Sequence, residues 1–337
     1  MVVAQVMAQE PWHPGRLLAV SGAYWQTCTL HAGVKLDIFT VIGEKALTAS
    51  ALAEKLDTDE DGTARLLNAL VAMALLVKEN DRYRNTPPSR AYLTKDSDQY
   101  IGYMILHHHH LVESWNRLDE SVSTGKPIAD QLPVSAADRL ENFLMGMFNT
   151  ASLTAPDLAR AVDLSGRHHL LDLGGGPGTY AIHFCRQNPR MKATVYDRPT
   201  SRPFAEKTIS RYNLADRIDF MAGDFTTDTL SGRYDVVWIS HILHSENPAA
   251  AAILLTKVAA VLAPGGLIIV HDFFLNDTMA APLFPALFSL NMLVRTESGR
   301  SYSEGEITAM LTAAGFRDVT RHPFRGPTDS GVLIGEK

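Results

Sequence analysis

Residues 170–178 read LLDLGGGPG, from Leu170 to Gly178. The run begins as a short apolar strand, and Gly174, Gly176 and Gly178 follow the strand directly. Glycines at these positions let the backbone turn sharply and let a ligand approach without Cβ atoms in the way. The helical pattern of residues 179–187 then directs a helix amino terminus at that ligand. The stretch therefore predicts a nucleotide-type site, although a glycine-rich turn alone is shared by many nucleotide-binding folds.

Three acidic residues around this turn narrow the expected ligand. Asp172 stands before the first glycine, where it would repel a pyrophosphate and attract the ammonium group of an amino acid. Asp197 ends the next apolar run, 19 residues after Gly178, where an acid accepts both ribose hydroxyls. Asp224 follows the third run and is placed to meet an adenine amino group, with Phe225 as a ring neighbour. Each acid alone reads equally well as a helix cap or loop residue, but their position at three successive strand ends favours the ligand.

The carboxyl-terminal half alternates short apolar runs with helical segments, which indicates a parallel sheet wrapped by helices. The runs are 170–173, 193–196, 218–222, 234–239 and 267–270. Two further runs, 319–324 and 332–336, predict a closing hairpin with an antiparallel edge strand. The predicted fold is α/β, with a Rossmann-like sheet in residues 163–337.

The amino-terminal part is helical in pattern. Helices are expected over 17–41, 47–56 and 63–77, followed by a polar hairpin-like stretch at 78–85. This order is typical of a winged helix, which serves either for DNA binding or for packing and dimerisation. The second helix of the pair offers Arg65 as its one basic residue among apolar ones, so the packing interpretation is favoured. We predict an all-α winged-helix dimerisation domain in residues 1–100 and a helical linker in 101–162 that contributes to an acceptor pocket.

Composition limits the partners. The chain has 337 residues, enough for two domains, with 46% hydrophobic and 20% charged residues. A net charge of −6 provides no general attraction to nucleic acid or anionic membranes, and neither is expected as a partner. The apolar stretch 249–270 contains Lys257 and Pro264 and does not read as a membrane span. Two distant cysteines, Cys28 and Cys185, and no signal-peptide pattern in residues 1–12 favour a cytoplasmic protein.

The chain resembles the small-molecule O-methyltransferase family of plant phenolic, acetylserotonin and bacterial polyketide O-methyltransferases. The resemblance covers nearly the whole chain and rests on four motifs in order, at 171–178, 197–199, 223–225 and 263–266. It implies S-adenosylmethionine as cofactor, a hydroxyl of a small aromatic or polyketide-like molecule as acceptor, and a homodimer formed through the amino-terminal domain. The cofactor-binding residues that it implies are Asp172, Gly174, Gly176, Gly178, Asp197, Arg198, Asp224, Phe225, Ser240 and His241.

The family places its general base after the fourth strand, where this chain reads SHILHSEN at 240–247. His244 falls on the base position, and a histidine that titrates near neutrality suits proton removal from a hydroxyl. The alternative is a histidine that only caps the helix after Pro248. His241 falls on the position beside the adenine or ribose. Plant members have a lysine where this chain has Ser240.

A catalytic imidazole needs an acidic partner that fixes its tautomer. Asp272 matches the family's first such acid, and Glu297 is the candidate for the second, whose aligned position is Ser301. The expected acceptor pocket contains Phe148, His110, Phe288, Asn291 and Met292. The run His107–His110 reads either as metal ligands or as pocket lining or a solvated face, and no metal is expected. The remaining alternatives are a C- or N-methyltransferase on the same scaffold and a non-catalytic winged-helix regulator that senses S-adenosylmethionine.

Overall fold

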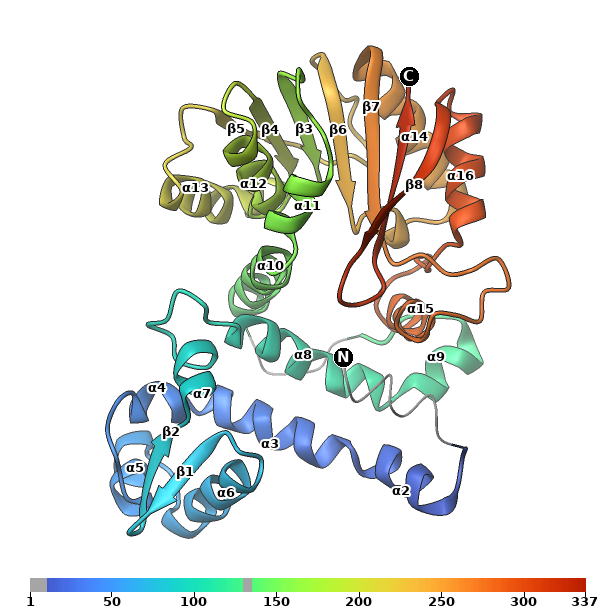
Figure 1. The fold of residues 1–337 in the computed structure, drawn as a ribbon. Helices are drawn as coiled ribbons and strands as arrows, with labels where there is room; N and C mark the ends of the chain where they lie inside the picture. The colour runs from blue at the N-terminus through green and yellow to red at the C-terminus, as the bar shows by residue number, and fades with distance from the viewer. Residues whose placement is uncertain (1–10, 130–134) are drawn as a thin grey trace. The chain divides into compact units, whose positions relative to one another are not determined.

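The computed structural model describes residues 11–129 and 135–337 and divides into two compact units (Figure 1). Unit 1 contains residues up to 112 together with 134–150, and unit 2 contains residues 113–133 and 151–337. Most of residues 1–12, in which no signal-peptide pattern was found, and part of the expected helical linker at 101–162 lie outside the described residues. The predicted domain boundaries at 100 and 162 stay predictions.

Unit 1 is largely helical, and polar residues begin its short helices. The side chains of Thr48, Asp59 and Thr86 accept backbone N–H groups at the starts of α5, α6 and α7. Ile38, Phe39 and Leu67 are fully buried in its apolar core. The helices with most of their length in this unit are α2 (Pro14–Gly22), α3 (Tyr24–Lys35), α4 (Ile38–Ile42), α5 (Ala49–Leu56), α6 (Glu60–Ala72), α7 (Pro87–Tyr92), α8 (Gly102–Trp115) and α10 (Ala136–Ser152).

The helical stretch expected over 17–41 is three helices rather than one. Ala23 separates α2 from α3, and α3 ends at Lys35. Asp37 has φ of 59°, a left-handed conformation that an α-helix does not contain, and α4 starts after it. Apolar periodicity does not report such breaks because it continues across a single left-handed residue.

A two-stranded hairpin follows α6, so unit 1 is not all-α as predicted. Strands β1 (Leu76–Glu79) and β2 (Arg82–Asn85) pair in antiparallel register. The two turn residues, Asn80 and Asp81, both have positive φ, the conformation of a type I′ hairpin turn. The observed order of helix, turn, helix and hairpin is the expected one, while the winged-helix name stays a prediction.

The second helix of that pair, α6, is unsuited to a DNA groove. Its residues Leu67 and Leu70 are fully buried. Its one arginine, Arg65, is 2.7 Å from the carboxylate of Asp61 on the same helix. A recognition helix needs free donors for base edges and phosphates. The packing interpretation of this region is therefore favoured by the structure as well.

Unit 2 is built on a seven-stranded sheet in the order β5-β4-β3-β6-β7-β9-β8, which confirms the predicted α/β fold. The first five strands in this order are parallel, and β9 pairs antiparallel with both β7 and β8. The predicted closing hairpin is therefore present. The strands are β3 (His169–Leu173), β4 (Lys192–Asp197), β5 (Ile218–Ala222), β6 (Tyr234–Ser240), β7 (Leu262–Asp272), β8 (Arg317–Arg325) and β9 (Gly331–Glu336).

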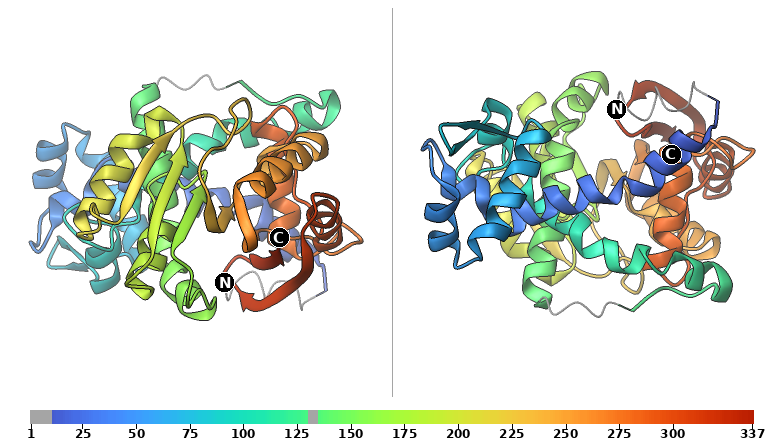
Figure 2. Two further views of the ribbon diagram at one scale, coloured as in Figure 1. Left: turned by 90° about the horizontal axis from the view of Figure 1, so that it is seen from above. Right: turned by 90° about the horizontal axis from the view of Figure 1, so that it is seen from below.

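Helices cover both faces of this sheet (Figure 2). Successive residues of a strand point to opposite faces, so Leu170 packs with α11 and α12 and Leu171 with α14 and α16. Both leucines are almost completely buried, as in a parallel sheet covered on two sides. The helices are α9 (Leu118–Thr124), α11 (Ala155–Ala161), α12 (Thr179–Gln187), α13 (Arg202–Arg211), α14 (Pro248–Val261), α15 (Leu283–Arg295) and α16 (Glu304–Ala313), with 3-10 turns η1 (Pro199–Ser201) and η2 (Leu243–Ser245).

The apolar stretch 249–270 is divided between two elements of this unit. Its first part lies in α14 and its second part is most of β7, a central strand of the sheet. The apolar character of residues 249–270 is explained by the burial of α14 and β7 in the core of this unit. In the described part of the chain, no helix has the length and apolar character needed to cross a membrane.

Candidate active site

The glycine turn lies at the carboxyl end of β3. The chain runs outward from β3 through β4 to β5 and then crosses to β6 on the other side of β3, so the strand order reverses at β3. Such a switch point is where open α/β sheets bind ligands. Gly174 and Gly178 have φ of 68° and 75°, which disfavours any residue with a Cβ. A Cβ on Gly174 would lie 2.3 Å from a side-chain carbon of Ile242. Both the backbone conformation and the packing of Ile242 therefore require glycine at 174.

Asp172 lies beneath the turn rather than on its surface. It is 1% exposed, and its carboxylate accepts the backbone N–H of Ala181 in α12 at 3.1 Å. Burial raises the pKa of Asp172 to about 7. The side chain therefore fastens the turn to α12, and its expected contact with an ammonium group stays a prediction.

Asp197, at the end of β4, links the turn to the neighbouring strand. Its Oδ2 accepts the backbone N–H of Gly176 at 2.7 Å, and its Oδ1 accepts the hydroxyl of Ser201 at 2.9 Å and the N–H of Arg198 at 2.6 Å. A carboxylate offers about four acceptor positions, so capacity for a further hydroxyl remains. The acid predicted to meet a ribose therefore lies directly against the glycine turn.

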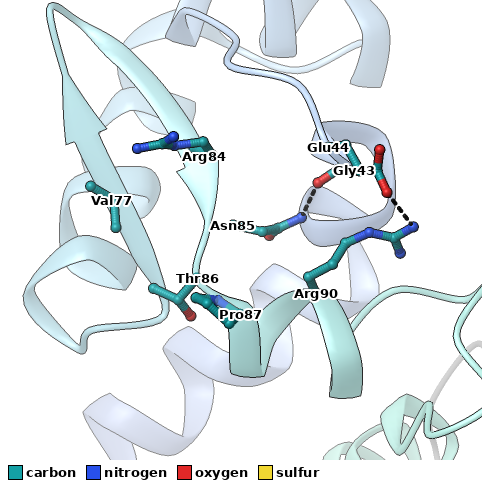
Figure 3. Close-up of a pocket in the computed structure, with 8 residues that line it drawn as sticks. All are labelled: Gly43, Glu44, Val77, Arg84, Asn85, Thr86, Pro87 and Arg90. Atoms are coloured by element: carbon teal, nitrogen blue, oxygen red, sulfur yellow. Dashed lines mark hydrogen bonds and ion pairs between the residues drawn. The ribbon is translucent and has the colours of Figure 1, made fainter.

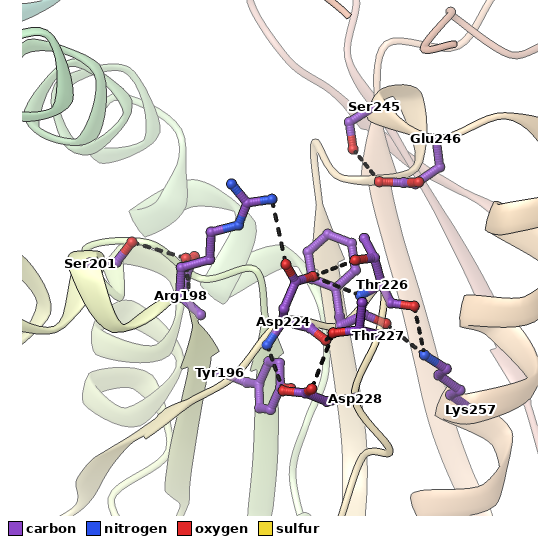
Figure 4. Close-up of polar contacts among 12 residues, drawn as sticks. Tyr196, Arg198, Ser201, Asp224, Thr226, Thr227, Asp228, Ser245, Glu246 and Lys257 are labelled. Carbon is purple, nitrogen blue, oxygen red and sulfur yellow. Dashed lines mark hydrogen bonds and ion pairs between the residues drawn. The ribbon is translucent and has the colours of Figure 1, made fainter. Parts of the chain in front are cut away.

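Asp224 follows β5 in a dense polar cluster (Figure 4). Its Oδ1 accepts both the N–H and the hydroxyl of Thr226, at 3.0 and 2.6 Å, and these bonds hold the pKa of Asp224 below its usual value. Its other oxygen is 3.7 Å from the guanidinium of Arg198. Lys257 donates to the backbone carbonyl of Phe225 at 2.9 Å. The structure thus brings together the predicted cofactor residues that follow β4 and β5.

His244 and Asp272 form a buried pair at the ends of two adjacent strands. His244 lies in η2, just after β6, and Asp272 ends β7. The Nδ1 of His244 is 2.7 Å from the Oδ1 of Asp272, and this oxygen also accepts the N–H of Phe273 at 2.8 Å. Burial alone would raise the pKa of Asp272, but the imidazoles of His244 and His241 hold it well below its usual range. A carboxylate that stays ionised in this position fixes the orientation and tautomer of the His244 ring.

His241 lies on the other side of Asp272. Its Nδ1 is 3.5 Å from the same Oδ1, and its ring packs on Phe273 with centroids 4.3 Å apart. Sequence reasoning expected His241 beside the cofactor and missed both contacts. The register that pairs Ser240 with His271 brings this segment beside Asp272, and no local pattern encodes that pairing.

The contacts of His271, which is buried, were also missed by sequence reasoning. The Nδ1 of His271 is 3.0 Å from the Ser240 hydroxyl, and its Nε2 is 3.0 Å from the Ser330 hydroxyl. Burial, followed by the nearby His241, lowers the pKa of His271 well below its usual value. A neutral His271 therefore connects the end of β6 to the loop between β8 and β9.

The acceptor-pocket candidates lie in both units. In unit 2, Phe288 of α15 meets the His244 ring edge-on at 4.7 Å, and Asn291 accepts the indole N–H of Trp115 at 3.0 Å. Met292 is buried in the same helix. Phe148 and His110 are buried in unit 1.

Glu297 does not reach the base in this structure. It is exposed, and no hydrogen bond or ion pair joins it to His244 within residues 11–129 and 135–337. Ser301, at the aligned position, is buried and donates to the carbonyl of Pro285. The backbone carbonyl of His244 instead accepts the N–H of Arg300 at 2.8 Å. The geometry supports one acidic partner, Asp272, and the role of Glu297 stays an unsupported prediction.

Unit 1 contains two further features. A hollow beside the hairpin is lined by none of the predicted site residues (Figure 3); its lining is Gly43, Glu44, Val77, Arg84, Asn85, Thr86, Pro87 and Arg90. In the histidine run, the Nε2 of His109 is 3.3 Å from the Lys35 ammonium nitrogen, and its ring meets His31 edge-on. A lysine this close favours a hydrogen bond over a bound cation at His109.

Two family models match the chain. An O-methyltransferase domain matches residues 125–317, and an O-methyltransferase dimerisation domain matches residues 18–95. The first match contains the glycine turn and the His244–Asp272 pair. The second lies within unit 1.

Similar proteins of known activity include three from Streptomyces. A 3-hydroxy-5-methyl-1-naphthoate 3-O-methyltransferase of Streptomyces sahachiroi is 33% identical, over 96% of this chain and 95% of that protein. The tetracenomycin polyketide synthesis 8-O-methyl transferase of Streptomyces glaucescens is 32% identical, over 96% and 97%. An N,N-dimethyltransferase of Streptomyces rimosus is 31% identical, over 89% and 90%. Among solved structures, human N-acetylserotonin methyltransferase in complex with S-adenosylmethionine has a TM-score of 0.85 at 27% identity, covering 98% of this chain and 99% of that one.

Proposed function

This chain belongs to the O-methyltransferase family and transfers the methyl group of S-adenosylmethionine to a hydroxyl, and we propose that His244 is its general base. The observation that carries this proposal is the 2.7 Å hydrogen bond between His244 and Asp272. The Nδ1 proton of His244 is directed at an ionised carboxylate, which leaves the Nε2 lone pair free to take a proton. Asp272 then stabilises the imidazolium that results.

The residues at the ends of β3, β4 and β5 fit the cofactor. When bound, S-adenosylmethionine supplies an electrophilic methyl group on a sulfonium. We propose that the glycine turn gives the cofactor close access to the backbone, that Asp197 accepts its ribose hydroxyls and that Asp224 meets its adenine. Arg198, Phe225, Ser240 and His241 complete the proposed set. These residues bind and orient, and most of the acceleration of an in-line displacement comes from such orientation.

The acceptor is proposed to be a small aromatic or polyketide-like hydroxyl compound. Phe273, Phe284 and Phe288 form a contiguous aromatic cluster against His244, with centroids of the contacting pairs 4.7–4.8 Å apart. Phe284 is 38% exposed, so part of this apolar surface remains available to a ligand. Planar apolar ligands pack well on such rings and leave the reacting hydroxyl beside the imidazole.

The test of this proposal is methyl transfer by His244→Gln to a panel of phenols and hydroxynaphthoates. Loss of the base is expected to lower kcat by about 10²- to 10⁴-fold, while the Kd for S-adenosylmethionine, measured by calorimetry, stays within about twofold. Turnover near the wild-type rate on a phenol would remove His244 as the base. Transfer to amines with unaffected turnover in His244→Gln would instead favour an N-methyltransferase, an activity that the Streptomyces rimosus relative carries by name.

The protein is further proposed to be a cytoplasmic homodimer formed through unit 1. Its match to a dimerisation domain and the exposed apolar side chains of α2 and α3 support the dimer, among them Leu18 (71% exposed) and Trp25 (69%). Its cysteines, Cys28 and Cys185, are both unpaired, which suits a reducing compartment. Leu18→Asp with Trp25→Asp is expected to lower the mass measured by light scattering to that of one chain.

A further inference from the structure

His241 has a buried nitrogen without a hydrogen-bond partner. Its Nδ1 is shielded from solvent and makes no hydrogen bond within the described residues. The Oδ1 of Asp272 lies 3.5 Å from that nitrogen. A buried donor without a hydrogen-bond partner is unfavourable, so a small movement that closes this gap is favourable. Catalytic hydrogen bonds are often long before substrate binds and tighten in the complex.

The backbone of His241 has an unfavourable conformation that the surrounding residues maintain. Its φ of 55° is in the left-handed region, which few non-glycine residues adopt. Its N–H donates to the carbonyl of His271 at 2.9 Å, and its ring lies between His271 and Phe273, with centroids 4.6 and 4.3 Å away. Strain of this kind persists where the surroundings impose it, and it concentrates at functional sites. In this backbone conformation, the Nδ1 edge of the His241 ring faces Asp272.

We propose that His241 is a positioning residue, which donates its Nδ1 hydrogen to Asp272 and so aims the carboxylate at His244. The inference rests on the proposed role of His244 as base. Asp272 Oδ1 would then accept three donors, from His244, His241 and the Phe273 backbone. Three donors around one oxygen fix the direction of the carboxylate more firmly than two.

The same contact affects the charge balance of the site. A donor on Asp272 draws negative charge from the carboxylate, so the imidazolium form of His244 is stabilised less. The other titratable groups around the pair are His271 on β7, Tyr180 on α12, Arg321 on β8 and Tyr302 before α16.

Two substitutions of His241 distinguish its role as a hydrogen-bond donor from the packing of its ring. His241→Phe keeps an aromatic ring against Phe273 but removes the donor. His241→Asn supplies an amide N–H at the same distance along the side chain, and asparagine tolerates the left-handed backbone. His168→Phe and His168→Asn, at an exposed histidine outside the site, are the matched controls. Each variant is assayed for kcat, acceptor KM, the pH dependence of kcat, the Kd for S-adenosylmethionine and thermal stability.

The expected result has two parts. His241→Phe lowers kcat about tenfold with acceptor KM nearly unchanged, and its kcat begins to fall at a higher pH than in wild type. His241→Asn restores most of the kcat and the original pH dependence. The His168 controls match wild type.

Each other outcome contradicts the inference. Equal kcat and pH dependence in both His241 variants would mean that the N–H donor of His241 does not contribute to catalysis. Equal losses in both variants with an unchanged pH dependence would mean that His241 is only structural. A raised Kd for S-adenosylmethionine with unchanged kcat would mean that His241 binds the cofactor and does not position Asp272. His244→Gln, assayed in parallel, separates the two proposals, because failure of the base role leaves that variant active whereas failure of the positioning role alone does not.

Discussion

The Nδ1 atom of His244 lies 2.7 Å from the Oδ1 atom of Asp272, although 28 residues separate the two in the chain. Parallel strands β6 and β7 end at the same edge of the sheet, and each residue stands at one of those ends. In the proposed mechanism this contact sets the direction of proton movement, because the carboxylate holds Nδ1 and leaves Nε2 as the basic nitrogen.

Asp272→Asn is expected to lower kcat by about 10²- to 10⁴-fold, because the asparagine amide can donate to Nδ1 and hold the ring in the wrong tautomer. Steady-state kinetics with a phenolic acceptor measures the loss. The Kd for S-adenosylmethionine should stay close to wild type, which distinguishes a tautomer effect from a collapsed site. A kcat within twofold of wild type would show that Asp272 does not orient the base.

Asp197→Asn is expected to weaken cofactor binding by about 10- to 100-fold, since hydrogen bonds to a charged group contribute about 1.5–3 kcal/mol. Titration calorimetry with S-adenosylhomocysteine measures the change. Asp219→Asn, at an exposed position on β5, is the matched control and should bind normally. Equal affinities in the two variants would contradict the proposed ribose contact.

Gly174→Ala is expected to lower the free energy of unfolding more than Gly166→Ala. Both glycines have positive φ, so each alanine introduces about 1–2 kcal/mol of backbone strain. A Cβ at 174 also meets the Ile242 side chain at 2.3 Å, whereas nothing lies within 4 Å of a Cβ at 166. Urea unfolding compares the two. A smaller loss at 174 would mean that Ile242 moves aside freely.

Asp172→Asn is expected to become more stable relative to wild type as the pH rises from 5 to 8. Folding raises the pKa of Asp172 from its ordinary value near 4 to about 7, so the folded wild type binds more protons than the unfolded chain between these values. Its free energy of unfolding therefore falls, by up to a few kcal/mol, as pH rises through that window. Asparagine at 172 removes this loss while its amide oxygen still accepts the Ala181 N–H. Urea unfolding curves at both pH values check the sign, and parallel pH dependences in the two proteins would contradict it.

Local patterns predicted most of the carboxyl-terminal unit. The strands, their alternation with helices and the glycine turn follow from apolar periodicity and backbone freedom, which a short segment encodes. The helix break at Asp37 was missed, because a single left-handed residue leaves no trace in hydropathy, whereas the hairpin expected at 78–85 is present. The fold class survived the missed break because it depends on many residues at once.

Only the second acidic partner of His244 was left open by the sequence. Asp272 was expected as the first acid, and sheet register brings it to the ring, while Glu297, the candidate for the second, remains exposed. The contacts of His241 with Asp272 and of His271 with Ser240 arise from the same register. Local sequence patterns thus predicted the strands and the glycine turn. The pairing of acid and base depends on packing between distant segments, which no local pattern contains.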